Sequence, residues 1–353
     1  MIRLENLTKE YDLPAGTHGP GQVVAADRLN LEIPAGEIFG LVGPNGAGKT
    51  TTLKMLCGLL VPTAGRVTVN QIDVEQHPED AQKHIGYLAD FFSCYDDLLV
   101  WEYFDYFARA YKLPAEQIPQ RVDYAIRVTG LESKRDAFIS GLSRGMKQRV
   151  GIGRAILHDP PVLVLDEPAS GLDPKARLEL KLLIKELNKP DSAAGGMGAK
   201  TGKTVFITSH VLSDLEEICT SVGILEKGKL VRVGPLEHIL RGGGVQAAGG
   251  AAAAAAVHAG RKFRVKLATP GFALKEWLGA RAGVSEITAA GSSGAALPSE
   301  MGNALEFTFA GNDEEVAALV RDLVAAGAPV CGMEELVQTL EQLYFKISSG
   351  EVM

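Results

Sequence analysis

The eight residues from Gly43 to Thr50 constrain this chain more than any other stretch. They read Gly-Pro-Asn-Gly-Ala-Gly-Lys-Thr, which fits the spacing of Gly, four residues and Gly-Lys-Ser/Thr that is typical of phosphate-binding loops. The apolar residues 38–42 predict a buried strand before the loop, and residues 51–57 predict the first turns of a helix after it. The alternative is an ordinary glycine-rich turn, which this strand–loop–helix context disfavours.

The spacing suits the capture of a phosphate chain. Glycines let several backbone N–H groups point at one anion, and the unpaired N–H groups of the following helix favour negative charge. Lys49 would reach the β- and γ-phosphates, and the Thr50 hydroxyl would hold Mg²⁺. The predicted nucleotide-binding residues of this stretch are Gly43, Pro44, Asn45, Gly46, Ala47, Gly48, Lys49, Thr50 and Thr51.

Composition limits the possible partners. The 353 residues are 46% hydrophobic and 22% charged, which is the range of ordinary globular proteins, and the net charge of −7 disfavours nucleic acid. The cysteines are scattered, without a metal-binding spacing. The N-terminus has no apolar signal core, and no run reaches the roughly 18 apolar residues of a membrane span. We therefore expect any work at a membrane to proceed through a partner.

Strand and helix patterns alternate through the first 240 residues, which predicts an α/β fold with a mostly parallel sheet and helices on both faces. The expected strands are 2–11, 23–33, 38–42, 65–74 (antiparallel), 85–88, 161–165, 204–208 and a hairpin over 222–233. The expected helices are 101–128 (broken at Pro114 and Pro119), 143–158, 174–188 and 212–219. Residues 12–22 and 191–202 are expected to form loops.

A second unit is expected after a Gly/Ala-rich linker over residues 241–260. Its pattern of strands and helices is βαββαβ, which predicts a small α+β ferredoxin-like domain over residues 261–353. The expected elements are 262–267, 272–281, 284–288, 304–309, 313–326 and 329–333, followed by a final helix over 336–347.

Aromatic residues crowd the segment from Phe91 to Tyr111 beyond the needs of one amphipathic stripe. Some of them must form the core of a helical region, and the surplus is a candidate docking surface for a partner. The residues are Phe91, Phe92, Tyr95, Trp101, Tyr103, Phe104, Tyr106, Phe107 and Tyr111.

Two carboxylates, Asp166 and Glu167, follow the buried strand 161–165. Ligands bind at the carboxyl ends of parallel strands, so these groups are expected at the site. Asp166 suits Mg²⁺, and Glu167 suits a general base or an orienting group for water. The alternative is that both only cap the next turn. His210, at the end of strand 204–208, should project at the same sheet edge.

Another anion site is predicted where Ser143 opens a basic helix. Its hydroxyl, the exposed N–H group of Gly145 and the helix N-terminus favour a phosphate, and a capping role for Ser143 is compatible with this. Ser170-Gly171-Leu172-Asp173 follows the two carboxylates within one turn.

In this order the motifs resemble the ATP-binding subunit of an ABC transporter, over about residues 1–240. The resemblance rests on residues 43–50, 142–148, 162–167, 170–173 and His210. It implies an ABC-type P-loop NTPase fold with an antiparallel β subdomain and a helical subdomain. The ending 340–346 and the appended domain resemble the exporter branch, which includes drug, sodium, lipid and polysaccharide carriers.

The resemblance implies two copies facing head to tail, with each ATP shared between them. Lys49, Glu167 and His210 would act in catalysis, and Thr50 and Asp166 would hold the metal. Ser143 and Gly145 would contact the ATP of the opposite copy, and Asp173 would touch that copy. Tyr11 matches the position whose ring stacks on adenine; the alternative is a packing aromatic at a strand end.

Three features depart from the family pattern. Asp90 stands where glutamine is usual, and it could reach the nucleotide's Mg²⁺ through water. Arg144 and Met146 replace glycine and glutamine, and Arg144 would either add a cation near the phosphates or point to solvent. The loop over residues 12–22 is longer than usual.

The sequence therefore predicts a Mg-ATP hydrolysing subunit at the cytoplasmic face of the membrane. A homodimer of it would power export through a separate multi-span permease, to which the aromatic segment would pass the movement. One alternative is an ABC-type ATPase without a permease. Another is a regulatory module that binds ATP without hydrolysis, against which the Asp166–Glu167 pair argues.

Overall fold

The computed structural model describes residues 1–12, 21–90, 94–190, 202–240, 261–269, 272–289, 304–336 and 338–348. The chain clusters into two compact units, one built mainly from Met1–Leu236 and the other mainly from the residues after it. The expected linker over 241–260 lies outside the described residues. So do residues 191–201 of the expected insertion, residues 13–20 of the long loop, and Phe91 and Phe92 of the aromatic segment.

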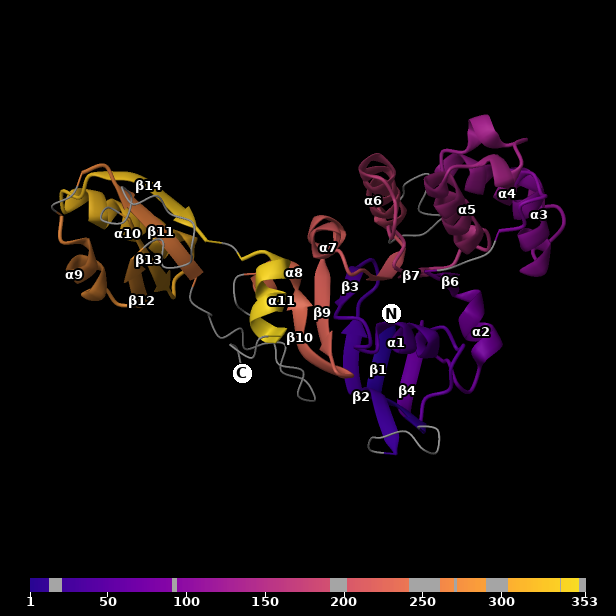
Figure 1. Cartoon of the computed structure of the whole chain (residues 1–353), viewed down its shortest axis with the longest axis horizontal. Helices are drawn as coiled ribbons and strands as arrows, with labels where there is room; N and C mark the ends of the chain where they lie inside the picture. Colours follow the sequence, from indigo (N-terminus) through magenta and orange to yellow (C-terminus); the bar gives the residue numbers. More distant parts are fainter. Residues whose placement is uncertain are drawn as a thin grey trace. The chain divides into compact units, whose positions relative to one another are not determined.

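Two sheets form the first unit within the described residues (Figure 1). One has the order β10-β9-β3-β8-β7-β6 and is parallel except at β10; the other, β2-β1-β4-β5, is antiparallel. β3, β7 and β8 are buried along their whole length, because helices or the second sheet cover both faces. The strands are β1 (Ile2–Asp12), β2 (Gln22–Ile33), β3 (Ile38–Val42), β4 (Ala64–Val69), β5 (Ile72–Asp73), β6 (Ile85–Leu88), β7 (Val162–Asp166), β8 (Thr204–Thr208), β9 (Ser221–Glu226) and β10 (Lys229–Pro235).

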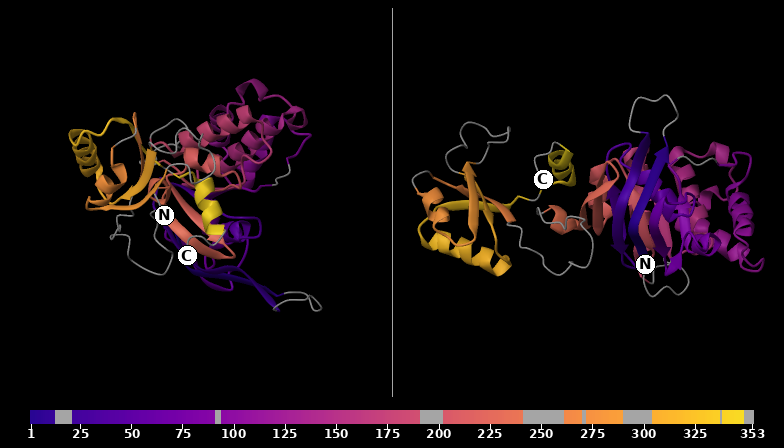
Figure 2. Two further views of the ribbon diagram at one scale, coloured as in Figure 1. Left: turned by 60° about the vertical axis from the view of Figure 1, so that its left-hand side comes forward. Right: turned by 90° about the horizontal axis from the view of Figure 1, so that it is seen from below.

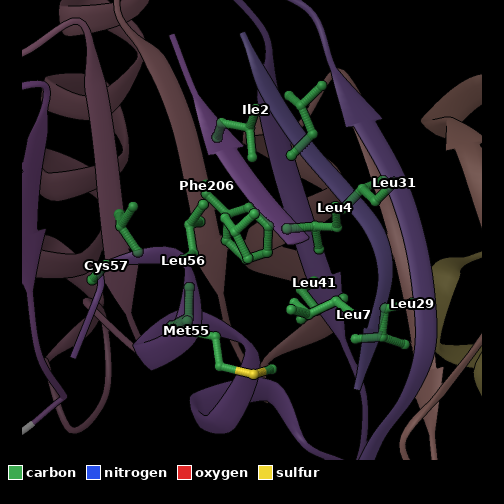
Figure 3. Packing of buried hydrophobic residues seen from close by; sticks show 14 of the residues in the cluster. Ile2, Leu4, Leu7, Leu29, Leu31, Leu41, Met55, Leu56, Cys57 and Phe206 are labelled. Carbon is green, nitrogen blue, oxygen red and sulfur yellow. The ribbon is translucent and has the colours of Figure 1, made fainter. Parts of the chain in front are cut away.

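The two sheets share one apolar core with α1 (Lys49–Leu56). Figure 2 shows the indigo strands β1 and β2 running across the strands of the other sheet. In Figure 3, Phe206 and Leu41 of the parallel sheet lie among leucines of the antiparallel sheet and Leu56 of α1. This core anchors both ends of the Gly43–Thr50 loop, since β3 enters it and α1 leaves it.

The helices of the first unit include a separate packed group, α3, α4 and α5, with its own core. The helices are α2 (Pro78–Lys83), α3 (Val100–Ala110), α4 (Ile118–Val128), α5 (Arg144–Ile156), α6 (Pro174–Asn188) and α7 (Leu212–Ile218), with 3₁₀ turns at Glu132–Lys134 and Ile139–Gly141. The expected break at Pro119 is wrong. Pro119 lies in the first turn of α4, where proline has no helical N–H partner to lose.

The second unit is an antiparallel sheet of order β12-β13-β11-β14 in the described residues, the order of a ferredoxin-like fold. Its core joins one face of this sheet to helices α9 and α10. The elements are β11 (Arg261–Leu267), α9 (Leu274–Gly279), β12 (Val284–Ala289), β13 (Ala304–Phe309), α10 (Asp313–Ala325), β14 (Val330–Glu335) and α11 (Leu340–Ser348); α8 (Leu236–Leu240) spans the boundary between the units.

The final helix begins later than the sequence predicts. The Leu336 N–H donates to the Lys262 carbonyl at 2.7 Å, which continues the sheet pairing beyond β14. Thr339 and Gln342 then exchange reciprocal 3.2 Å hydrogen bonds, which fix the start of α11. Across the described parts of the chain, no helix is both long enough and apolar enough to cross a bilayer.

Candidate nucleotide-binding site

The loop from Gly43 to Thr50 joins the buried strand β3 to α1, as its sequence predicts. Gly48 caps the helix with a φ of 106°, and a β-carbon there would lie 2.1 Å from the Ala25 carbonyl oxygen. Glycine is therefore required at this position by both conformation and space. The Ala47 N–H donates to the Pro44 carbonyl at 3.1 Å, which closes the loop on itself.

Lys49 lies inside this loop and is almost fully buried. Its ammonium group donates to the carbonyl oxygens of Gly43 at 2.7 Å and Pro44 at 3.3 Å. A buried ammonium needs such partners, because desolvation without them is costly. The cation is thus held at the centre of the loop.

Asp166 is also buried, at the carboxyl end of β7. It accepts hydrogen bonds from the Thr50 hydroxyl at 3.3 Å and from the Thr208 hydroxyl at 2.7 Å. The parallel register places Asp166 opposite Thr208, which explains the shorter bond. Both partners are uncharged hydroxyls, and carboxylate and hydroxyl oxygens are ligands that Mg²⁺ accepts.

Glu167 lies next to this pair and has a φ of 49°, in the left-handed region. Its N–H donates to the Thr208 hydroxyl at 3.1 Å. Its carboxylate accepts from the backbone N–H of His210 at 3.0 Å and lies 2.6 Å from His210 Nδ1. The structure therefore brings His210 to the same sheet edge as the two carboxylates, with its ring bonded to Glu167.

Asp90 is exposed and is the last residue described before residue 94. Asp90 and Asp166 both act on Tyr87: burial raises the pKa of the Tyr87 hydroxyl, and the negative charges of Asp166 and Asp90 raise it further.

Ser143, Gly145 and Asp173 form a second group, at the N-termini of α5 and α6. The Ser143 hydroxyl accepts from the Met146 N–H at 3.3 Å, and Asp173 accepts from the Ala176 N–H at 2.9 Å. A β-carbon at Gly145 would lie 2.8 Å from the Ala176 β-carbon, so the two helix ends are in tight contact. The Ser143 end is exposed, and the N–H groups of the first turn of α5 have no acceptor within the helix.

Tyr11 lies near the end of β1, opposite Val23, and its side chain is exposed. Lys9 Nζ lies 5.4 Å from the centre of its ring. Val23 is two residues from Ala25, whose carbonyl lies against Gly48, so the ring belongs to the same region of the sheet.

Two residues of this region carry contacts that the sequence analysis did not assign to them. Thr208, fully buried, joins Asp166 to the backbone of Glu167. The sequence feature that could have indicated this role is the position of Thr208 at the end of β8, the strand beside β7. Arg144 donates to the Ser170 carbonyl at 3.0 Å, and neither motif alone predicts that contact.

The chain is similar in sequence and fold to known proteins. The sequence model of the family described as "ABC transporter" matches residues 26–170. The probable multidrug ABC transporter ATP-binding protein YbhF of Escherichia coli is 36% identical over 234 residues, which is 66% of this chain and 37% of that protein. The Nod factor export ATP-binding protein I of Cupriavidus metallidurans is 34% identical over 66% of this chain and 71% of its own length.

An importer subunit shows a similar sequence identity to this chain. The methionine import ATP-binding protein MetN of Geobacillus kaustophilus is 36% identical over 68% of this chain and 67% of that protein. Among solved structures, the dimeric ATP-binding cassette MJ0796 bound to ADP and Pi superposes with a TM-score of 0.57 at 26% identity, covering 67% of this chain and 99% of that one.

Proposed function

This chain belongs to the ATP-binding proteins of ABC transporters, which are ATPases, and we propose that it powers export through a separate membrane permease. The observation that carries the proposal is the bonded series Thr50–Asp166–Thr208–Glu167–His210 beside the phosphate-binding loop. It offers the acceptors, the cation site and the base that phosphoryl transfer to water needs.

The triphosphate would lie in the Gly43–Thr50 loop. Lys49 would exchange its bonds to neutral carbonyls for bonds to charged phosphate oxygens, which are stronger. Thr50 and Asp166 fit Mg²⁺ because a hydroxyl and a carboxylate oxygen lie within 3.3 Å of each other. The metal, when bound, would offset negative charge on the phosphates. Asp90 would reach the metal through a water molecule. The Tyr11 ring would stack on the adenine of the nucleotide.

Glu167 would accept the proton of the attacking water. His210 would hold the carboxylate in place through Nδ1 and contact the γ-phosphate with the rest of its ring, which is exposed. The water oxygen forms the new bond to phosphorus, the bond to the β-phosphate oxygen breaks, and the proton passes to Glu167.

The second half of each site would come from another copy. The exposed Ser143 end of α5 suits a phosphate, since the Ser143 hydroxyl lies at a helix N-terminus, whose N–H groups favour an anion. The dimeric MJ0796 cassette supports this reading. ATP would hold two copies together and hydrolysis would release them, with Ser143 and Gly145 facing the partner's nucleotide and Asp173 touching the partner.

The permease would dock on the aromatic surface formed by Tyr95, Tyr106 and Phe107. Tyr95 and Tyr106 are each 50% exposed and their ring centres lie 5.5 Å apart, whereas Tyr103 and Phe104 beneath them are fully buried. Exposed aromatic groups of this kind are typical of interfaces. The chain would then act at the cytoplasmic face of a membrane.

Export is favoured by the names of two relatives, multidrug and Nod factor export proteins, and a methionine import protein stands at similar identity.

We also propose that residues 261–353 are a separate regulatory or dimerising domain that follows the ATP-binding domain. Co-purification with a multi-span protein from solubilised membranes is the test for the permease. Recovery free of any membrane protein would favour an ABC-type ATPase without one.

The replacement Glu167→Gln tests the site itself. It keeps the shape of the side chain and removes the base, so ATP binding is expected to persist while turnover falls by about 10²–10⁴. Light scattering with Mg-ATP should show a trapped dimer. Lys49→Ala is the control, in which nucleotide binding itself weakens. Unchanged turnover in Glu167→Gln would refute the base, and a monomer under these conditions would refute the shared site.

A further inference from the structure

Arg144 fits closely onto the turn that follows the catalytic carboxylate. Its Nη2 donates to the Ser170 carbonyl at 3.0 Å. Gly171 has a φ of 66°, and a β-carbon there would lie 2.3–2.5 Å from the guanidinium atoms. Only glycine leaves room for the guanidinium to lie against this part of the turn.

The same turn determines where Glu167 lies. The Ser170 N–H donates to the Glu167 carbonyl at 3.0 Å, which closes the turn. Glu167 itself is in the left-handed region, which is unfavourable for a residue with a β-carbon and persists only when surrounding contacts hold it. Thr208 of β8 accepts from the Glu167 N–H, and Arg144 of α5 donates to the Ser170 carbonyl of the same turn.

Two further contacts join α5 to α6, and both lie after Arg144 along α5. Gly145 touches Ala176 in the first turn of α6, and Arg149 forms an ion pair with Glu179 one turn further along. The end of α5, the turn over residues 170–173 and the start of α6 are therefore connected at three places. Arg144 makes the contact that includes the turn.

We propose that Arg144 is a positioning residue that couples the two ATP sites, because it ties the turn after Glu167 to the Ser143 end of its own α5. The inference rests on the shared sites proposed above. In such a dimer, Glu167 would activate the water that attacks the ATP of its own copy, and Ser143 would contact the ATP of the other copy. A movement of either is passed through Arg144 to the other.

The contact can be tested in the free chain without nucleotide. Hydrogen exchange of the backbone amides of Ser170 and Leu172 reports the closure of the turn, since both amides are bonded within it. Arg144→Ala is expected to speed this exchange about tenfold. Arg127→Ala is the matched control, because it removes an exposed arginine from α4. Unchanged exchange in Arg144→Ala would overturn the proposal.

Arg144→Lys separates charge from shape. Lysine keeps the positive charge but lacks the planar group that lies against Gly171, so exchange is expected to stay close to that of Arg144→Ala. Full protection by lysine would mean that charge alone is enough, and it would overturn the positioning role.

A mixed dimer tests the coupling. One tagged copy is wild type and the other carries Glu167→Gln, so that hydrolysis occurs only at the carboxylate of the first copy. Arg144→Ala in the first copy is expected to lower turnover about tenfold, because its turn holds the working Glu167. A loss seen only when the second copy carries Arg144→Ala would assign Arg144 to direct contact with the partner's phosphate. That result, or no loss in either copy, would overturn the proposal.

The two proposals fail in different ways. If Glu167→Gln copies never form a dimer with Mg-ATP, the shared site is wrong and the coupling falls with it. If the dimers form and turnover is indifferent to which copy carries Arg144→Ala, only the coupling is wrong.

Discussion

Asp166 in the parallel sheet and Glu306 in the C-terminal sheet are both nearly buried carboxylates on strands, and their partners differ in kind. Asp166 ends β7 and is bonded to the hydroxyls of Thr50 and Thr208. Glu306 lies in the middle of β13 and accepts from Arg264 Nε at 3.2 Å and Nη2 at 2.8 Å. The partner of Glu306 is a cation within the sheet, whereas the two partners of Asp166 are uncharged hydroxyls.

At similar burial, this is the difference expected between the proposed metal-binding carboxylate and a structural ion pair. Arg264 also pairs with Glu334 on the neighbouring strand at 2.9 Å, so charges alternate across the open face of the C-terminal sheet. Opposite charges facing each other across strands stabilise a sheet. Replacing the partners of each carboxylate should therefore affect catalysis in one unit and stability in the other.

Thr208→Val is expected to have the largest effect of the changes that test this comparison. Valine keeps the shape of threonine but removes the hydroxyl that Asp166 and the Glu167 N–H both use. Asp166 would keep only its bond from Thr50, and the Glu167 N–H would lose its acceptor, which should lower turnover roughly 10- to 100-fold. Steady-state ATP hydrolysis at saturating nucleotide measures the loss. Thr68→Val, at a half-buried threonine of β4, is the control and should keep wild-type turnover. Equal turnover in the two variants would show that Asp166 and Glu167 need no support from β8.

The sequence predicted the framework of this site because its elements are local. The loop Gly43–Thr50 carries its strand and helix on either side, and the apolar strand before Asp166 places the carboxylates at the sheet edge. The contact between Asp166 and Thr208 depends on the register of two strands that are distant in the sequence. Register is set by packing, so sequence patterns could place both residues at one edge but could not pair them.

Side-chain reach limited the prediction in the same way. Arg144 was expected either near the phosphates or in solvent, and its bond to Ser170 depends on the packing of α5 on α6. In the C-terminal unit the order of elements follows from alternation, whereas the late start of α11 depends on a strand bond between Leu336 and Lys262. Such non-local bonds leave no pattern in a single sequence.

Glu306→Gln is the matching change in the other sheet and should act on stability. Glutamine keeps the oxygen that accepts from Arg264 but removes the negative charge that Arg264 and Lys262 face, which should cost about 2 kcal/mol in the free energy of unfolding. Trp277 belongs to the C-terminal core, so its fluorescence in a Trp101→Phe background reports this unit alone during denaturation. ATP turnover should stay within twofold of wild type. A catalytic loss without destabilisation would break the comparison.

Acid should distinguish the units by a smaller effect, centred on His158 in the first unit. Burial lowers the pKa of His158 to about 4, from an ordinary value of 6.5. Its Nε2 donates to the Ile85 carbonyl at 3.1 Å, and its Nδ1 is buried without a partner, so protonation would bury an unbonded N–H. Because the folded-state pKa is the lower one, the contribution of neutral His158 is complete above pH 6.5 and is lost as pH falls toward 4.

The first unit should therefore lose about 1 kcal/mol between pH 7 and pH 5.5 through this residue. The C-terminal unit should not. Burial works against the charge of Glu306, but Arg264 and Lys262 outweigh it and hold its pKa below the ordinary 4.5, so that contribution is lost only at lower pH. Trp101 fluorescence in a Trp277→Phe background measures the first unit. His158→Gln, which keeps a donor for Ile85, should flatten its pH dependence, and the exposed His77→Gln should not. If the first unit loses as much stability with acid in the His158→Gln variant as in wild type, the buried histidine is not the source of the pH dependence.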